Sequence, residues 1–277
     1  MTGVIVRAAL ACLAIGLVGF GAPPVALARD DLANRILHPV RAPEHLREAL
    51  VEQADAAFAQ RLLAGEPLAR EDVADWLRTS GHALADLLAR TGMDPARLLL
   101  GAIEGEAPGV GGPFVSLADA DTLPELQMTA LVDRVMASVP LALPLEASYR
   151  LTSGFGPRRD PFRGTRAFHR GIDLAAPRGT PIHATAEGTV IRVGRHGAYG
   201  NLVEVDHGNG VRTLYAHLHS YLVKHGDLVR AGQKVGTMGR TGRATGVHLH
   251  YEVIVDDRPV DPQRFFEVGR VLIARAS

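Results

Sequence analysis

Two histidines one residue apart, His248 and His250, interrupt an apolar stretch that otherwise has the composition of a buried strand. In a strand, residues i and i+2 point to the same face, so the two imidazoles should project side by side. Burying two imidazoles without partners is costly. They are therefore either hydrogen-bonded core residues or part of a metal site, and a metal site needs further ligands.

His169 and Asp173 can supply those ligands. The glycine and proline residues around them argue against a helix, so we expect the pair to straddle a bend that leads into a strand. One imidazole and one carboxylate from this pair, with one imidazole from His248 and His250, form a His₂Asp set. With water in the fourth position, this is the composition of a catalytic zinc site. The sequence has no HExxH motif, which excludes the helix-based arrangement of zinc proteases.

Histidine is concentrated in one part of the chain, because nine of the twelve histidines fall between His169 and His250. Besides His169 and the pair His248 and His250, a third group of histidines lies within Tyr215–His219 and consists of His217 and His219. The sequence therefore predicts that several imidazoles from separate strands meet at one site.

The order of the motifs resembles a known family. Residues 149 to 262 resemble the LytM/lysostaphin-type zinc metallopeptidases, which cut peptide bridges in peptidoglycan. The resemblance depends on seven stretches in the same order: Ser153–Pro161 (SGFGPRRDP), His169–Asp173 (HRGID), Gly179–Pro181, Tyr199–Asn201, Tyr215–Leu218 (YAHL), Thr241–Gly242 and Thr245–Glu252 (TGVHLHYE).

The resemblance implies a role for each residue that matches the family motif. His169, Asp173 and His250 would bind zinc, and His217 and His248 would be the unliganded catalytic histidines. Tyr199 and Asn201 match a stretch beside the cleft of the family, where they would either contact substrate or stabilise a turn. These seven residues are the candidate site.

The start of the chain has the features of an export signal. Arg7 precedes an apolar run from Ala8 to Phe20, and Ala26-Leu27-Ala28 has the small residues of a cleavage site, so we expect a signal peptide at 1–28. An uncleaved anchor helix is the alternative. The only cysteine, Cys12, lies in this segment, so the mature chain would have no disulfide and no thiolate ligand.

The remainder predicts an α+β protein in two parts. Residues 29–145 have helical periodicity, with breaks that indicate short helices in a small all-α domain and a Gly/Pro-rich joint near 106–114. Residues 146–277 change to a period of two and predict a mainly antiparallel β metallopeptidase domain. Its expected strands are 189–193, 201–205, 211–218 and 248–255.

Charge is divided unevenly between these two parts. Residues 29–145 carry 10 Lys and Arg against 18 Asp and Glu, whereas residues 146–277 carry 19 against 12. The acidic part could dock on the basic part, as a scaffold or as a lid over the cleft, or the basic part could face an anionic partner. No basic stripe or recognition motif indicates nucleic-acid binding.

Together these features predict an exported, periplasmic zinc endopeptidase with peptidoglycan as its partner and no stable membrane anchor after signal cleavage. The expected substrate is the directly cross-linked stem peptide, cut by D,D-endopeptidase activity. The alternative is a non-catalytic protein of the same fold that binds the wall or activates another cell-wall hydrolase.

Overall fold

The computed structural model describes residues 58, 60–61, 64, 66–79, 82–104 and 124–275. The expected signal peptide at 1–28 and the joint near 106–114 lie outside the described residues. Within the described ranges, no helix has the length and apolar character that a membrane span requires.

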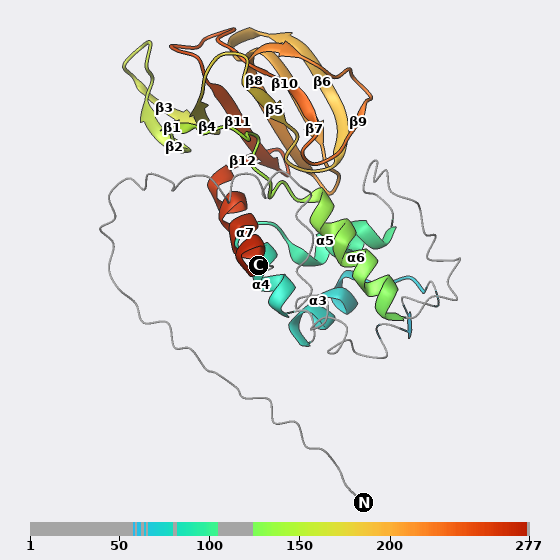
Figure 1. Ribbon diagram of the computed structural model, residues 1–277. Coiled ribbons are helices and arrows are strands. Elements are labelled where there is room, and N and C mark those ends of the chain that lie inside the picture. The colour runs from blue at the N-terminus through green and yellow to red at the C-terminus, as the bar shows by residue number, and fades with distance from the viewer. Residues whose placement is uncertain are drawn as a thin grey trace, which may run out of the picture.

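Helices flank the strands in the chain, with one at the C-terminal side (Figure 1). They are α3 (Arg70–Thr79), α4 (His82–Ala89), α5 (Pro95–Glu104), α6 (Pro124–Ser138) and α7 (Pro262–Arg275). The expected N-cap is present, since Asp94 Oδ1 accepts a hydrogen bond from Ala96 N at 3.1 Å. The helical expectation for this part of the chain is therefore confirmed. Helix α7 was not expected, although Asp261 caps it by accepting a hydrogen bond from Gln263 N at 3.0 Å.

The strands form one large antiparallel sheet and a separate hairpin. The sheet runs in the order β1-β4-β11-β8-β7-β6-β9, with β10 paired to β5 and β8, and β12 paired to β11. Strands β2 and β3 form the hairpin. The bounds are β1 (Arg150–Ser153), β2 (Gly156–Arg159), β3 (Arg166–His169), β4 (Ile172–Ala175), β5 (Pro181–His183), β6 (Gly188–His196), β7 (Gly200–Asp206), β8 (Val211–Tyr221), β9 (Leu228–Val229), β10 (Lys234–Met238), β11 (Leu249–Val255) and β12 (Arg258–Val260). The predicted antiparallel β part is confirmed, and the four expected strands correspond to β6, β7, β8 and β11.

The central strands β8 and β11 give the sheet two different faces. Their register pairs Tyr251 with Tyr215 and His250 with Ala216, and successive residues point to opposite faces. The two tyrosines belong to the large hydrophobic core, and their hydroxyls lie 2.9 and 3.0 Å from Thr185 Oγ1. His250 therefore projects from the opposite face of the strand that anchors the core.

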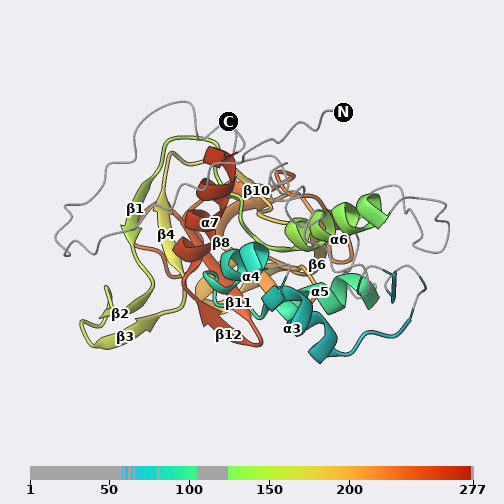
Figure 2. The same cartoon turned by 90° about the horizontal axis from the view of Figure 1, so that it is seen from below.

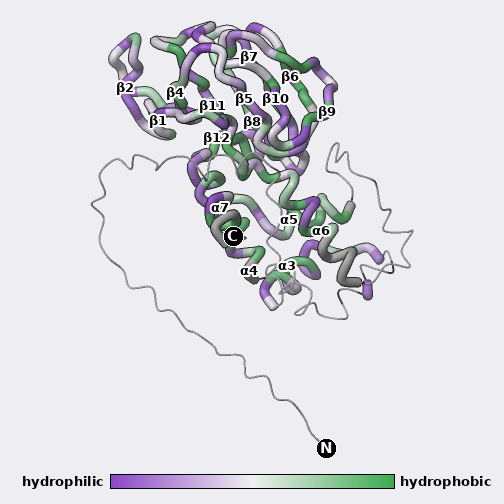
Figure 3. The backbone as a smooth tube through the Cα atoms, viewed as in Figure 1, coloured by the Kyte–Doolittle hydropathy of each residue, from purple (hydrophilic) through white to green (hydrophobic). Residues whose placement is uncertain are grey.

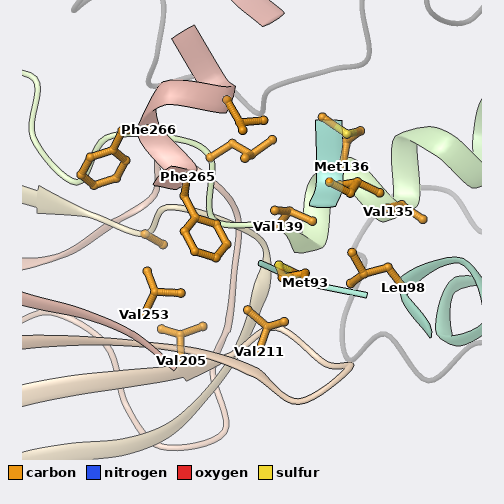
Figure 4. Packing of buried hydrophobic residues seen from close by; sticks show 14 of the residues in the cluster. Met93, Leu98, Val135, Met136, Val139, Val205, Val211, Val253, Phe265 and Phe266 are labelled. Carbon is orange, nitrogen blue, oxygen red and sulfur yellow. The ribbon is translucent and has the colours of Figure 1, made fainter. Parts of the chain in front are cut away.

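The hydrophobic core continues from the helices into the sheet. Figure 4 shows Val135 of α6 and Val139, just after that helix, in the same packed layer as Val211 of β8, Val253 of β11 and Phe265 of α7. All five side chains are at most 2% exposed. The expected helices are therefore present, but their core is continuous with that of the sheet, so the expectation of a small all-α domain is confirmed only in part.

The helices contact one end of the central strands. Asn209, in the turn between β7 and β8, packs so closely on α5 that a Cβ at Gly101 would lie 1.7 Å from its Oδ1. Arg97 of α5 also pairs with Asp256, in the turn after β11. Figure 2 looks onto this helical layer, with the β2–β3 hairpin projecting to one side, and Figure 3 shows hydrophobic stretches on both sides of the junction.

Candidate metal and catalytic site

Three side chains converge on a single point at the other end of β11. His169 Nε2 lies 3.1 Å from His250 Nδ1 and 3.2 Å from Asp173 Oδ1, and Asp173 Oδ1 lies 2.9 Å from His250 Nδ1. A tetrahedral zinc ion with bonds of about 2.0–2.2 Å holds its ligand atoms about 3.3–3.5 Å apart. The triangle in this protein is slightly tighter than that, and it needs only a small expansion to hold an ion.

Strand pairing brings these residues together. His250 of β11 lies directly opposite Asp173 of β4, and His169 ends β3 just before the bend that leads into β4. Gly171 occupies that bend, where a Cβ would lie only 2.2 Å from Tyr251 O. Only glycine allows the bend to approach β11 this closely, so the expected bend between His169 and Asp173 is present for a definite steric reason.

The donor set fits a cation rather than a neutral core. His169 Nδ1 lies 2.7 Å from Gly154 O and His250 Nε2 lies 2.9 Å from Glu252 Oε1, and a carbonyl or carboxylate oxygen requires an N–H donor there. The other nitrogen of each ring therefore presents its lone pair to the point shared with Asp173 Oδ1. Two lone pairs and a carboxylate oxygen at this spacing repel one another unless a positive charge lies between them.

The charges around the trio agree with this interpretation. When no metal is bound, a proton shared at this point takes the place of the cation: burial opposes ionisation of Asp173, but hydrogen bonds from a protonated His169 or His250 outweigh it and hold the pKa of Asp173 well below its usual range. Burial lowers the pKa of His250, but Asp173 and Glu252 outweigh it and raise that pKa overall. A position that attracts a proton in this way also attracts a metal ion.

Two further imidazoles lie beside the trio without belonging to it. The rings of His217 and His248 have centroids 4.8 Å apart, and His248 Nε2 lies 3.7 Å from Asp173 Oδ1. Nδ1 of His217 lies 2.8 Å from Thr241 O, and Nδ1 of His248 lies 3.0 Å from Gly246 O. Each ring therefore donates from Nδ1 and keeps Nε2 free to accept a proton.

Both of these imidazoles are neutral near pH 7. Burial, assisted by the neighbouring His248, lowers the pKa of His217 to about 4, and burial also lowers the pKa of His248. His217 has a φ of 59°, which is rare for a residue that is not glycine. Such backbone strain occurs preferentially at functional sites, and here it re-aims the His217 side chain within β8.

The loop before β11 contains Thr241, whose backbone oxygen accepts the hydrogen bond from His217 Nδ1, and this loop is itself held by the neighbouring strands. Thr241 Oγ1 donates a hydrogen bond to Leu218 O at 2.8 Å and accepts one from Asn201 N at 2.9 Å. Asn201 Nδ2 also donates to His219 O at 3.2 Å. Asn201 therefore links β7 to this loop through its backbone and to β8 through its side chain, and it does not line the cleft.

Tyr199 lies at the site itself. It lines the cleft, and its hydroxyl donates a hydrogen bond to Glu252 Oε1 at 2.8 Å. Burial and the Glu252 carboxylate raise the pKa of Tyr199 to about 12, so the phenol stays protonated. Of the two candidate substrate contacts, Tyr199 lines the cleft and Asn201 does not.

A cleft of about 420 Å³ opens over this arrangement. Its lining includes Arg158, Arg159 and Phe162 of the β2–β3 hairpin, together with Tyr199 and Arg243. No residue of the described helices lines it. The described helices therefore give no support to the hypothesis that the acidic segment forms a lid, which stays a prediction.

Two residues of the site were not singled out from the sequence. Glu252 is 1% exposed and supports His250 from the same face of β11. Arg158 Nη1 lies 3.1 Å from Asp173 Oδ2 and 2.6 Å from Ser153 Oγ, so it holds the carboxylate oxygen that faces away from the trio. The i, i+2 spacing of His250 and Glu252 was a readable signal, whereas the Arg158 contact depends on the tertiary fold.

Comparison with known proteins agrees with this geometry. Residues 167–262 match the family model described as peptidase family M23. The chain is 50% identical over 113 residues to the DD-carboxypeptidase/endopeptidase Mpg of Neisseria meningitidis, covering 41% of this chain and 26% of that protein. It is 46% identical over 123 residues to the peptidoglycan DD-endopeptidase ShyB of Vibrio cholerae, covering 44% of this chain and 29% of that protein.

A solved structure of a zinc-containing peptidase from Vibrio cholerae is 46% identical, with a TM-score of 0.41, covering 43% of this chain and 37% of that one. The chain spans less than a third of the length of the two curated relatives.

Proposed function

We propose that this chain is a zinc-dependent endopeptidase that hydrolyses peptide cross-links of bacterial peptidoglycan, on the premise that residues 167–262 match peptidase family M23. The names of the relatives Mpg and ShyB support a D,D-endopeptidase acting on directly cross-linked stem peptides. The observation that carries the proposal is the convergence of His169 Nε2, Asp173 Oδ1 and His250 Nδ1 beside two imidazoles that stay outside this trio.

His169, Asp173 and His250 would hold the zinc ion and leave its remaining position open to the cleft. A bound zinc ion lowers the pKa of a coordinated water to about 7 and polarises a peptide carbonyl. The hydrogen bonds that the two imidazoles donate to Gly154 O and to Glu252 keep both rings in the tautomer that this binding needs.

His217 and His248 would move protons and stabilise charge. Because both rings are neutral and donate from Nδ1, each has an unprotonated Nε2 that can take a proton from the attacking water. The imidazolium that results can return the proton to the leaving amine. The other ring, less than 5 Å away between centroids, would stabilise the negative charge on the attacked carbonyl only when its own Nε2 carries a proton, because an unprotonated Nε2 has no N–H to donate.

We further propose that the chain is exported to the periplasm, where the substrate lies. The sequence supports a leader at 1–28, a helical part at 29–145 and a catalytic part at 146–277. The helical part would act as a scaffold, since the described helices share the core of the sheet.

Digestion of purified, cross-linked muropeptide dimers tests the function. The expected result is conversion of dimers to monomers, identified by mass, with no activity in His250→Ala or after chelation of the metal. Dimers that remain intact with the zinc-loaded protein would exclude the endopeptidase and favour a non-catalytic wall-binding protein.

A further inference from the structure

The cleft carries more positive charge than the trio requires. Arg158, Arg159 and Arg243 line it, whereas the carboxylate that lines the cleft is Asp173 of the trio itself. Arg158 is occupied by Asp173 and Ser153. Arg243 is paired only in part, through one of its guanidinium nitrogens, with Asp160 of the β2–β3 hairpin.

Arg243 is held in one position by the β2–β3 hairpin. Its Nη2 lies 2.6 and 2.8 Å from the two carboxylate oxygens of Asp160, and its guanidinium carbon lies 4.6 Å from the centroid of the Phe162 ring. Asp160 is itself fixed, because Oδ1 accepts hydrogen bonds from the backbone nitrogens of Phe162 and Arg163 at 2.8 and 2.9 Å. The backbone of Arg243 is also tied, by a 2.8 Å hydrogen bond to Ala198 O.

Part of this fixed guanidinium has no partner. Among the described residues, no hydrogen bond is made by Nε or Nη1 of Arg243, and its side chain is 40% exposed at the edge of the cleft. Guanidinium N–H groups match the geometry of a carboxylate, and a side chain that is already immobilised loses little entropy on binding. The unpaired N–H groups of Arg243 are therefore held in position to bind an anionic group of a ligand.

We propose that Arg243 is a specificity-determining residue that binds a free carboxylate of the peptide substrate close to the scissile bond. This inference rests on the proposed function, because a cross-linked stem peptide is the substrate that would bring such a carboxylate into the cleft. It predicts that the enzyme distinguishes stem peptides with free carboxylates from the same peptides in amidated form.

Two cross-linked muropeptide dimers that differ only in amidation of their carboxylates provide the test. For the unmodified protein, kcat/KM for the free-carboxylate dimer should exceed that for the amidated dimer by about tenfold to a hundredfold, the worth of charge-assisted hydrogen bonds. Arg243→Gln should bring this ratio close to one, mainly through a higher KM. Arg243→Lys, which keeps the charge without the fork of donors, should give an intermediate ratio.

The matched control is Arg240→Gln, which removes one positive charge from the same loop. Arg240 is exposed, does not line the cleft, and contacts Ala244 O at 3.5 Å. Its variant should keep the preference of the unmodified protein. A preference that persists in Arg243→Gln, or that Arg240→Gln abolishes equally, would overturn the inference.

Direct binding of both dimers to the same proteins separates the two proposals. If neither dimer is cleaved, the proposed function fails, while a binding preference that Arg243→Gln removes still supports carboxylate binding by Arg243. If both dimers are cleaved and bound equally by the unmodified protein, the function stands and the inference fails.

Discussion

His250 and Glu252 lie on the same face of β11, and the imidazole Nε2 is 2.9 Å from the carboxylate Oε1. The carboxylate is almost completely buried and also accepts the hydroxyl of Tyr199. This pair directs the lone pair of Nδ1 toward Asp173 and so prepares His250 for a metal ion.

Replacing Glu252 by Gln should therefore weaken zinc binding by roughly 10- to 100-fold, the usual effect of losing an outer-shell partner. Competition with a chromophoric chelator measures the affinity directly. Tyr199→Phe, which leaves the carboxylate in place, is the matched control and should have the smaller effect. Equal zinc affinity in Glu252→Gln and the unmodified protein would show that the pair does not orient His250.

The zinc content of single variants should distinguish His217 and His248 from the three residues of the trio. His217→Ala and His248→Ala should each retain one zinc ion per chain, because neither ring belongs to the trio. Both should lose muropeptide cleavage by roughly 10²- to 10⁴-fold, the contribution of a general acid or base. His250→Ala should lose the metal as well as the activity, as measured by elemental analysis. A variant at His217 or His248 that loses its zinc would place that residue among the ligands.

The shared core predicts that helices and sheet unfold together. Phe265 is fully buried where α7 meets the strands, so Phe265→Ala should lower the free energy of unfolding by about 3–5 kcal/mol. Trp76, the only tryptophan, reports on α3, and far-UV circular dichroism reports on the whole chain. The two denaturation curves should coincide and shift together in the variant.

Leu228→Ala is the control for that experiment, because this leucine is 56% exposed. It should leave both curves nearly unchanged. Separate Trp76 and dichroism transitions in the unmodified protein would mean that the helices form an independent unit after all.

Acid should destabilise the protein through a histidine far from the cleft. His207 is 1% exposed, with Nδ1 2.6 Å from Glu187 O and Nε2 2.8 Å from Thr213 Oγ1, and burial lowers its pKa to about 4 from 6.5. Between these two values the unfolded chain binds a proton that the folded chain does not, so stability is lost as the pH falls from 6.5 to 4. The loss from this group is on the order of 3 kcal/mol.

Urea denaturation across this pH range should show the effect. His207→Gln should be less stable at pH 7 but have a shallower dependence on pH. His225→Gln, which removes an exposed imidazole, controls for the substitution itself. An unchanged slope in His207→Gln would mean that other groups cause the acid sensitivity.

Much of the site was predictable because its residue types are improbable in a buried strand. His248 and His250 in an apolar run, and the glycine bend between His169 and Asp173, indicated a trio of ligands without any coordinates. The position of each imidazole on its strand followed from the period of two. The hydrogen bonds that fix the tautomers could not be predicted in this way, since one acceptor, Gly154 O, is a backbone atom that only the fold brings next to His169.

Contacts between remote segments were beyond the sequence pattern. Periodicity indicates that Val211 and Val253 are buried, but it does not say that helices rather than a second sheet cover them. The pairing of Arg243 with Asp160, 83 residues apart, likewise depends on the fold. Helix α7 is different, because Asp261-Pro262 is the same start signal as Asp94-Pro95 and could have been used.

Helix α5 meets the end of β11 that is remote from His250, where Arg97 pairs with Asp256, and α7 packs behind the strand, where Phe266 stacks on Tyr251. The described helices therefore lie together on one side of the strands (Figure 1), and none of their residues lines the cleft. A partner that binds the helices would leave the cleft accessible, so attachment of the protein through its helical side is compatible with the proposed cleavage of a polymer.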